Sequence, residues 1–339
     1  MLDNNAVTGV SIIIPNWNGL YLLKQSLDPL LKAVDNFKGK AEVIVVDNGS
    51  QDRSVDVMLD YYPNIQIKRF SHNTGFGYAC NSGVELAKYS HVLFLNNDIY
   101  IPDNLIEVLV SFFKDKPDSF SVSPQTNFWR GKELTSEVFS SSINFSFNSD
   151  GELIQHWAVN QFNNIAERES PTIYGTGAVL LVNKSKFIKL GGFDSIYGLA
   201  YWEDVDLCLR AWRKGWGSYY TSEIIAWHKV SASSGGDKLE FKRRMMVANY
   251  IIFHLINVAD IKITLRFINS IRKYHNSLKK KGEYEMAKYL RKKIFKLIPG
   301  ILIRKCKLII GSELSLNEII SQIPMPAGAW KSGPVLYDD

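Results

Sequence analysis

Residues 42–50 read EVIVVDNGS, and they carry the clearest indication of the fold class. The four residues after Glu42 form a continuous apolar run instead of alternating with polar residues. A continuous run is typical of a strand that is covered on both faces, as in a parallel sheet. Asp47-Asn48-Gly49-Ser50 then ends the run, because these residue types favour turns. The stretch predicts a buried strand that ends on polar side chains.

The flanking sequence repeats this strand, turn and helix pattern up to about residue 125. Strands are expected at 10–14, 65–70 and 91–95, and helices at 21–34, 54–62 and 83–88. Such alternation predicts an α/β fold with a doubly wound, mostly parallel sheet flanked by helices. Ligands of these sheets bind at the carboxyl ends of the strands.

The pattern changes beyond residue 125. Residues 126–170 are rich in Ser, Asn, Phe and Trp and are expected to form an irregular insertion that covers a cleft. A strand is expected at 178–182, a helix at 205–214, helices over 238–310, and irregular chain over 322–339. We therefore expect an α/β domain over 1–235 and a basic helical region over 236–339.

The composition is that of an ordinary globular protein, with 339 residues, 46% hydrophobic and 22% charged. Three cysteines lie far apart in the sequence and are expected to be free thiols. The first residues do not resemble a signal peptide, and no apolar run has the length of a membrane span. A cytoplasmic location follows as the expectation.

The charge is divided unevenly along the chain. Residues 238–307 contain 19 Lys and Arg against 4 acids, whereas the rest of the chain has more acids than bases. Basic residues among Leu, Ile and Phe on helices fit peripheral contact with an anionic membrane, here the inner face of the plasma membrane. A solvated helical face and a homo-oligomer interface are the alternatives. Nucleic-acid binding is not expected, because the segment has long apolar runs and no recognition motif.

Polar clusters follow three of the expected strands, at 15–19, 47–52 and 96–98, and a glycine-rich segment lies at 73–81. Each cluster alone could be an ordinary turn. Together, at one edge of one sheet, they predict a binding site. The glycine-rich segment lacks the spacing of a dinucleotide-binding or P-loop motif. Glycines before a helix nevertheless allow the backbone to approach a phosphate or a sugar closely.

A further cluster precedes the expected helix at 205–214. Glu203, Asp204 and Asp206 are three acids within four residues. Complementing the helix dipole explains Asp206. It does not explain Trp202 beside the other two acids, and a carboxylate there could accept a proton from a hydroxyl nucleophile.

Five stretches, in order, resemble family 2 glycosyltransferases, which are nucleotide-sugar enzymes with the GT-A fold, and in particular their bacterial rhamnosyltransferase-like branch. The stretches are VSIIIPNWNG (10–19), VIVVDNGSQDRS (43–54), NTGFGYACNSG (73–83), LFLNNDI (93–99), and GTGAVLLVNKSKFIKLGGFD with YWEDVDLCLRAWRKGW (within 175–216). They cover about residues 10–230.

The resemblance implies a donor site. Asp47 would contact the base or the ribose, and neighbouring residues would line that pocket and the sugar-diphosphate site. Asn97 lies in the turn after the fourth strand and is counted with this set. The implied nucleotide- and donor-binding residues are Pro15, Asn18, Asp47, Asn73, Gly75, Asn81 and Asn97.

The resemblance also implies the reacting groups. Asp98 and His228 would hold a divalent metal, Mn²⁺ or Mg²⁺, on the diphosphate. Asp204 would be the general base, with Glu203 as the less favoured alternative. Trp202 is a candidate for stacking on an acceptor sugar. Many relatives have Asp-x-Asp where this chain has Asn96-Asn97-Asp98, so we expect weaker metal binding than at a site with two acids.

The expected function is inverting, metal-dependent transfer of a sugar from a nucleotide-sugar donor to a glycan acceptor, lipid-linked, in bacterial cell-surface polysaccharide (O-antigen) synthesis. The 73–83 segment favours dTDP-rhamnose as donor. A UDP- or GDP-hexose or a galactofuranose donor is the alternative within the fold. A non-catalytic glycan- or nucleic-acid-binding protein is the alternative of another class, and the intact acids at 98, 203 and 204 disfavour it.

Overall fold

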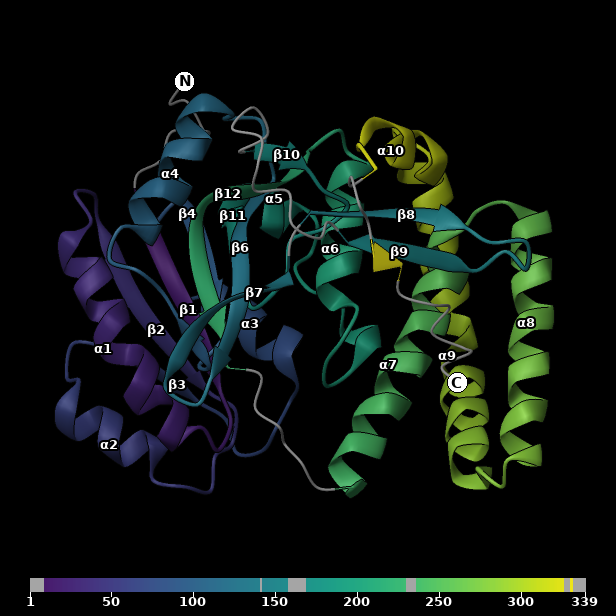
Figure 1. Ribbon diagram of the computed structural model, residues 1–339, viewed down its shortest axis with the longest axis horizontal. Helices are drawn as coiled ribbons and strands as arrows, with labels where there is room; N and C mark the ends of the chain where they lie inside the picture. The colour runs from purple at the N-terminus through teal and green to yellow at the C-terminus, as the bar shows by residue number, and fades with distance from the viewer. Residues whose placement is uncertain (1–8, 141, 158–168, 230–235, 326–329, 332–339) are drawn as a thin grey trace.

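The computed structural model of the chain describes residues 9–140, 142–157, 169–229, 236–325 and 330–331. A ten-stranded sheet lies in the left part of Figure 1, and long helices form the right part. The strand order is β10-β12-β6-β11-β4-β1-β2-β3, with β5 paired to β12 and β7 paired to β6. The predicted α/β class is confirmed, as a mixed sheet flanked by helices.

The first half of the sheet is parallel. Its elements are β1 (Val10–Asn16), α1 (Leu20–Asn36), β2 (Ala41–Asp47), α2 (Ser54–Tyr61), β3 (Gln66–Arg69), α3 (Phe76–Val84), β4 (His91–Leu95), β5 (Ile99–Tyr100) and α4 (Leu105–Asp115). Strands β2 and β3 lie on one side of β1, and β4 lies on the other. The topological switch point, where such sheets bind ligands, therefore lies between β1 and β4.

Side chains of β1 alternate between two apolar layers. Ile12 and Ile14 pack in the layer that contains α1, α2 and α4, whereas Ile13 packs in the layer that contains α3 and α6. All three isoleucines are buried. Helices on both faces explain why the strands read as continuous apolar runs.

Helix α3 spans Phe76–Val84, so the helix predicted at 83–88 overlaps it only at its last two residues. Gly75 precedes the helix with φ of 95°, a conformation that favours glycine. A Cβ atom on Gly83 would lie 2.5 Å from Cγ2 of Ile13. The glycines therefore continue into the helix because it packs directly on the sheet.

Most of the region predicted to be an irregular insertion forms strands. They are β6 (Ser121–Arg130), β7 (Glu133–Ser140), β8 (Ile143–Phe147), β9 (Leu153–Trp157) and β10 (Glu169–Pro171). Strand β6 pairs with β7, β11 and β12, so its backbone groups are satisfied within the sheet although its side chains are largely polar. Residues 158–168 of the predicted insertion lie outside the described residues.

The next elements agree with the predicted strand and helix. They are β11 (Val179–Asn183), α5 (Lys184–Lys189), the 3₁₀ turn η2 (Ser195–Tyr197), α6 (Glu203–Trp212) and β12 (Ser218–His228). Strand β11 runs antiparallel to both β4 and β6. This reversal makes the sheet mixed.

The basic C-terminal region is helical, as predicted. It comprises α7 (Gly236–Asn257), α8 (Ile261–Lys280), α9 (Tyr284–Gly311) and α10 (Leu316–Gln322), and β13 (Trp330–Lys331) pairs with β9. The apolar layer around α3 and α6 continues into α7, α8 and α9. The two-domain division at residue 235 stays a prediction, and the core does not break there. Most of 322–339 lies outside the described residues.

None of the helices within the described ranges is both long enough and apolar enough to cross a bilayer. The longest, α9, carries basic residues through most of its length.

Candidate active site

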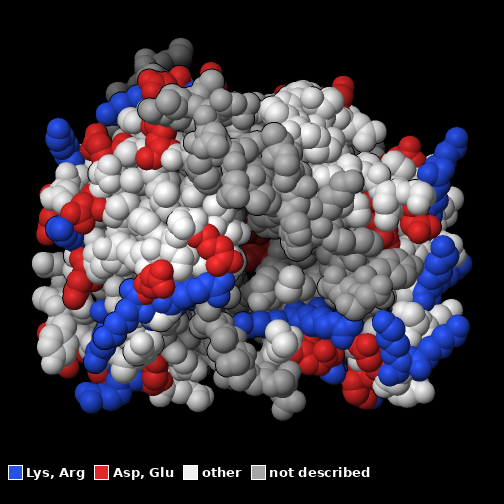
Figure 2. Space-filling view, in the orientation of Figure 1, with Lys and Arg blue, Asp and Glu red and all other residues white. Residues whose placement is uncertain are grey.

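The polar clusters meet at one edge of the sheet. Strands β1, β2 and β4 are parallel neighbours, and Asn16 at the end of β1 is level with Asp47 at the end of β2. Asn96, Asn97 and Asp98 follow β4 directly. Figure 2 shows a small hollow near the centre of the molecule with acidic atoms at its floor.

Asn16 connects the three strand ends. Its Nδ2 donates to Asp47 Oδ1 and to Ser50 Oγ, at 3.2 Å each, and its Oδ1 accepts from Asn97 Nδ2 at 2.8 Å. A Cβ atom on Gly19 would lie 2.1 Å from Asn97 Nδ2, so only glycine leaves room for this bond. The sequence analysis placed Asn16 in the polar cluster at 15–19 but assigned it no role, although an amide that ends a buried strand was a signal for one.

Asp47 is completely buried in this structure. Oδ1 accepts from Asn16, Oδ2 accepts from the Ser50 backbone N–H at 3.2 Å, and Arg69 Nε lies 3.8 Å from Oδ2. These bonds hold the turn after β2 against the end of β1. The contact between Asp47 and a base or ribose stays a prediction.

Asn18 and Pro15 lie beside this turn. Asn18 is exposed with φ of 51°, its N–H donates to Ser50 Oγ at 2.8 Å, and its Oδ1 accepts from the Gln51 N–H at 2.7 Å. Pro15 is half-buried in β1. Asn18 therefore connects the end of β1 to the turn after β2.

The glycine-rich loop is tied to the end of β2 by Asn48. Its Nδ2 donates to Asn73 Oδ1 and to the Gly75 carbonyl, and its Oδ1 accepts from the Thr74 N–H. A Cβ atom on Gly75 would lie 2.6 Å from the Gly198 carbonyl oxygen. The loop is therefore fixed on one side to β2 and on the other to the segment before α6.

Asn81 makes a second link to that segment. Its Nδ2 donates to the Phe193 carbonyl and its Oδ1 accepts from the Phe193 N–H, both at 2.9 Å. Both ends of the amide are therefore bonded to one residue. A direct donor contact by Asn81 stays a prediction.

Asp98 and His228 lie side by side. Strand β5 pairs with β12 so that His228 is opposite Ile99, and Nε2 of His228 is 3.2 Å from Oδ1 of Asp98. The two atoms lack the alignment of a hydrogen bond, and Oδ1 is buried without a hydrogen-bond partner. Both side chains are only slightly exposed.

This pair fits a divalent cation. A carboxylate oxygen and an imidazole nitrogen that converge without bonding each other form a partial coordination shell, and the mixed O/N set suits Mn²⁺ somewhat better than Mg²⁺. Across the described parts of the chain, no group of three or more His, Cys, Asp or Glu side chains could hold a metal ion. The remaining ligands would therefore be phosphate oxygens and water.

Two hydrogen bonds lead from Asp204 to Asn96, which lies two residues before Asp98. Oδ2 of Asp204 accepts from the Gly177 N–H at 2.9 Å, and the carbonyl of the next residue, Ala178, accepts from the Asn96 N–H at 2.9 Å. Burial raises the pKa of Asp204, although the N–H groups of Gly177 and Val205 stabilise its ionised form. Asp204 is half-buried, and the sequence reading did not identify Gly177 as its partner.

Glu203 is the more buried of the two acids, at 7% exposed, and its Oε2 has no hydrogen-bond partner. Burial, and then the negative charge of Asp204, raise the pKa of Glu203 to about 8. At neutral pH Glu203 is therefore protonated, and its neutral carboxyl lies beside Asp204.

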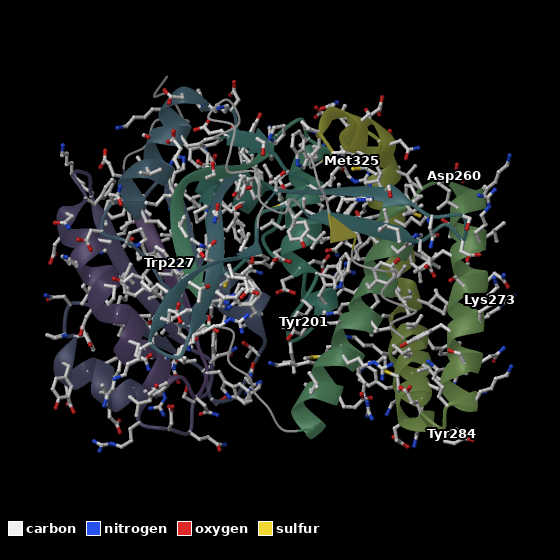
Figure 3. All side chains as sticks on the ribbon, in the orientation of Figure 1. Tyr201, Trp227, Asp260, Lys273, Tyr284 and Met325 are labelled. Carbon is white, nitrogen blue, oxygen red and sulfur yellow. The ribbon has the colours of Figure 1, made fainter. Side chains whose placement is uncertain are left out.

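Trp202 is buried and lies against two aromatic rings of α7, those of Tyr250 and Phe253, at centroid distances of 5.2 and 5.0 Å. Its stacking on an acceptor sugar stays a prediction. Tyr201 and Trp202 both have φ of 75°, which for residues with side chains costs about 1–3 kcal/mol each. Figure 3 shows Tyr201 between α6 and α7.

Asn249 of α7 holds this strained segment. Its Nδ2 donates to the carbonyls of Tyr197, Ala200 and Tyr201, at 2.8, 2.8 and 2.9 Å. Lys293 of α9 donates to its Oδ1 at 2.7 Å, and burial lowers the pKa of Lys293 to about 8. The sequence carried no signal for Asn249, which lies in the middle of a long helix.

Comparison with known proteins agrees with this geometry. The sequence profile described as Glycosyl transferase family 2 matches residues 11–190, more than half of the chain. The N-acetylglucosaminyl-diphospho-decaprenol L-rhamnosyltransferase of Mycobacterium tuberculosis is 27% identical over 212 residues, 58% of this chain and 68% of that enzyme. Chondroitin synthase of Pasteurella multocida is 25% identical over 231 residues, 62% of this chain and 24% of that enzyme.

Two solved structures share the fold at 14% sequence identity. GalNAc-T7, solved with UDP, GalNAc and Mn²⁺, has a TM-score of 0.58 over 76% of this chain and 49% of its own, so this chain spans about half of its length. A mannosyltransferase from Pyrobaculum calidifontis, solved with GDP-Man and Mn²⁺, has a TM-score of 0.52 over 90% of this chain and 81% of its own. With the profile match covering the strand ends that build the site, the chain belongs to Glycosyl transferase family 2 and has the GT-A fold.

Proposed function

We propose that the protein transfers a sugar from a nucleoside-diphosphate donor to a glycan hydroxyl with inversion at the anomeric carbon. One observation carries this proposal. The Gly177 N–H fixes Asp204, and the carbonyl of the next residue, Ala178, accepts from the N–H of Asn96, which belongs to the same triplet as Asp98. A base and a metal-binding carboxylate thus belong to one hydrogen-bonded edge of the sheet.

Asp204 acts as the general base. The acceptor hydroxyl loses its proton to Asp204 while its oxygen forms a bond to the anomeric carbon, and the bond from that carbon to the diphosphate oxygen breaks. The Gly177 N–H directs Oδ2, which keeps the other carboxylate oxygen in a defined position. A single base opposite the leaving group gives one displacement and therefore inversion.

Asp98 and His228 would hold the divalent cation. That cation, when bound with the donor, stabilises the negative charge on the departing diphosphate. Support comes from the convergent, unbonded geometry of this pair and from the Mn²⁺ in both solved neighbours.

The donor would lie along the ends of β1 and β2 and the glycine-rich loop. Asn18 and Pro15 would border the base and ribose with Asp47 below them, while Asn97, Asn73, Gly75 and Asn81 shape the adjoining surface. The favoured donor is dTDP-rhamnose, which agrees with the rhamnosyltransferase relative. A UDP- or GDP-hexose or galactofuranose donor is the alternative.

The acceptor would be a lipid-linked glycan in bacterial cell-surface polysaccharide synthesis, at the inner face of the plasma membrane. The rhamnosyltransferase relative has a diphospho-decaprenol acceptor in its name. The basic C-terminal helices support contact with an anionic membrane surface.

A donor panel tests the proposal. We would measure nucleoside diphosphate release from dTDP-, UDP- and GDP-sugars with Mn²⁺ or Mg²⁺, with and without an extract of lipid-linked glycans. We expect release that depends on metal and extract and that is lost in Asp204→Asn. If wild type and Asp204→Asn release diphosphate at equal rates, the assignment of Asp204 as base is wrong.

A further inference from the structure

The second half of α9 exposes an apolar face. Phe295, Ile298, Leu302 and Ile309 follow one another at helical spacings of three, four and seven, so they lie along one side of the helix. They are 76, 40, 56 and 57% exposed. Ile303 and Ile310, at 55 and 86% exposed, widen this surface, which we call the α9 face. A contiguous exposed apolar surface marks an interaction site.

The first half of the same helix is basic. Lys288 and Arg291 precede Phe295 by seven and four residues, so they continue the line of the α9 face, and both are exposed. The exposed residues Lys292, Lys296 and Lys307 lie beside that line. Figure 2 shows further Lys and Arg along the right margin, over α8 and the start of α9. One side of α9 is therefore basic first and apolar afterwards.

Charge favours an anionic bilayer over a parallel dimer as the partner of the α9 face. In a parallel dimer through this face, Lys288 and Arg291 would meet the same basic residues of the second copy, which is unfavourable. An anionic bilayer attracts these basic residues and accepts the isoleucines, Phe295 and Leu302 at the level of the headgroups. Helix α9 does not have the composition to span the bilayer, so it would lie along its surface.

We propose that the α9 face docks the protein on an anionic phospholipid bilayer, with the exposed apolar side chains of the α9 face inserted at the interface. Helix α9 is also connected to the segment before the catalytic acids, because Arg304 donates to both carboxylate oxygens of Asp194 at 2.6 and 2.7 Å. Docking would therefore set the position of residues 194–202, the segment before α6, relative to the membrane. The inference rests on the membrane contact proposed above, but its test needs neither donor nor acceptor.

Co-sedimentation with vesicles tests the proposal. The full chain is mixed with vesicles of phosphatidylglycerol and phosphatidylcholine, or of phosphatidylcholine alone, at low and high salt. Phe295→Gln, Leu302→Gln and Ile309→Gln are combined in one variant. Its matched control changes exposed apolar residues elsewhere, Leu59, Tyr61 and Ile188, to Gln. A third variant changes Lys288, Arg291 and Lys292 to Gln, and circular dichroism checks that all fold.

We expect wild type and the control to bind the anionic vesicles, and the apolar α9 variant to bind at least tenfold more weakly. The basic variant should lose most binding to anionic vesicles and its dependence on salt. Equal binding by wild type and the apolar variant would overturn the α9 assignment while leaving membrane contact in place. No binding by wild type would overturn both, but not sugar transfer. A wild-type dimer in analytical ultracentrifugation that the apolar variant abolishes would identify the face as a self-interface instead.

Discussion

The Nε2 atom of His228 lies 3.2 Å from the Oδ1 atom of Asp98, yet the two do not form an aligned hydrogen bond. Strand pairing between β5 and β12 imposes this proximity on two residues that are distant in the chain. A buried carboxylate oxygen without a partner is costly unless a ligand satisfies it. The free oxygen of Asp98 beside His228 is the observation on which the proposed cation site rests.

Replacing Asp98 should abolish metal-dependent transfer. We expect Asp98→Ala to lower kcat/KM at least about a hundredfold, because the stabilisation of the leaving group by the cation is worth several kcal/mol. Asn96→Ala should only weaken transfer. The measurement is nucleoside diphosphate release against Mn²⁺ concentration. Titration of Mn²⁺ with UDP, followed by electron paramagnetic resonance, gives a readout independent of turnover. Full activity of Asp98→Ala with metal present would show that Asp98 does not hold the metal.

The two neighbouring acids should differ in their response to neutral isosteres. Asp204→Asn should lower kcat by about 10²–10⁴, the usual contribution of a general base. Glu203→Gln should stay within about tenfold of wild type at pH 7, because Glu203, with its pKa raised to about 8, is already protonated there. The pH profile of kcat/KM checks this. Because burial raises the pKa of Asp204, activity should begin to fall, on acidification, at a pH above the ordinary pKa range of Asp. A larger loss of kcat in Glu203→Gln than in Asp204→Asn would indicate that Glu203, and not Asp204, is the general base.

Stability should fall as pH rises through the titration of Glu203. The folded protein holds this proton up to about pH 8, whereas the unfolded chain releases it near the ordinary pKa of 4.5. Between these values the folded state binds more protons, so the free energy of unfolding decreases with increasing pH. Urea denaturation at pH 6 and pH 9 measures this. The free energy of unfolding of Glu203→Gln should decrease less between these pH values than that of wild type. Equal decreases would show that a group other than Glu203 causes the pH dependence.

Asn249 should support the loop before Glu203 and Asp204. Asn249→Ala leaves three backbone carbonyls without their shared donor, and we expect a loss of roughly 1–3 kcal/mol in the free energy of unfolding. Turnover should also fall, because Tyr201 and Trp202 can then relax from their strained conformation. Asn36→Ala, at an exposed position at the end of α1, is the control and should change stability little. Unchanged kcat in a folded Asn249→Ala would show that the loop keeps its position without this residue.

The parts of the fold that follow from local pattern could be predicted. Residues 42–46 required a strand covered on both faces, and the helices of the basic region followed from composition. The extent of α3 could not, because glycines usually interrupt helices and only the approach to Ile13 explains Gly83. Strands β6 to β9 were also missed. Their sequences contain many polar residues, and the pairing of their backbones is seen only in the folded sheets.

Chain direction and periodicity were enough to predict which polar residues lie at one edge of the sheet. Polar residues that follow parallel strands must gather at the same end of the sheet, so Asn16, Asp47 and Asp98 could be placed there from the sequence. Their partners from distant parts of the chain could be identified only in the folded structure. His228 reaches Asp98 through the register of β12, Gly177 holds Asp204 through the turn before β11, and Asn249 supports the loop through the packing of α7. These contacts depend on strand register and helix placement, which the cooperative packing of the whole chain sets and no local stretch encodes.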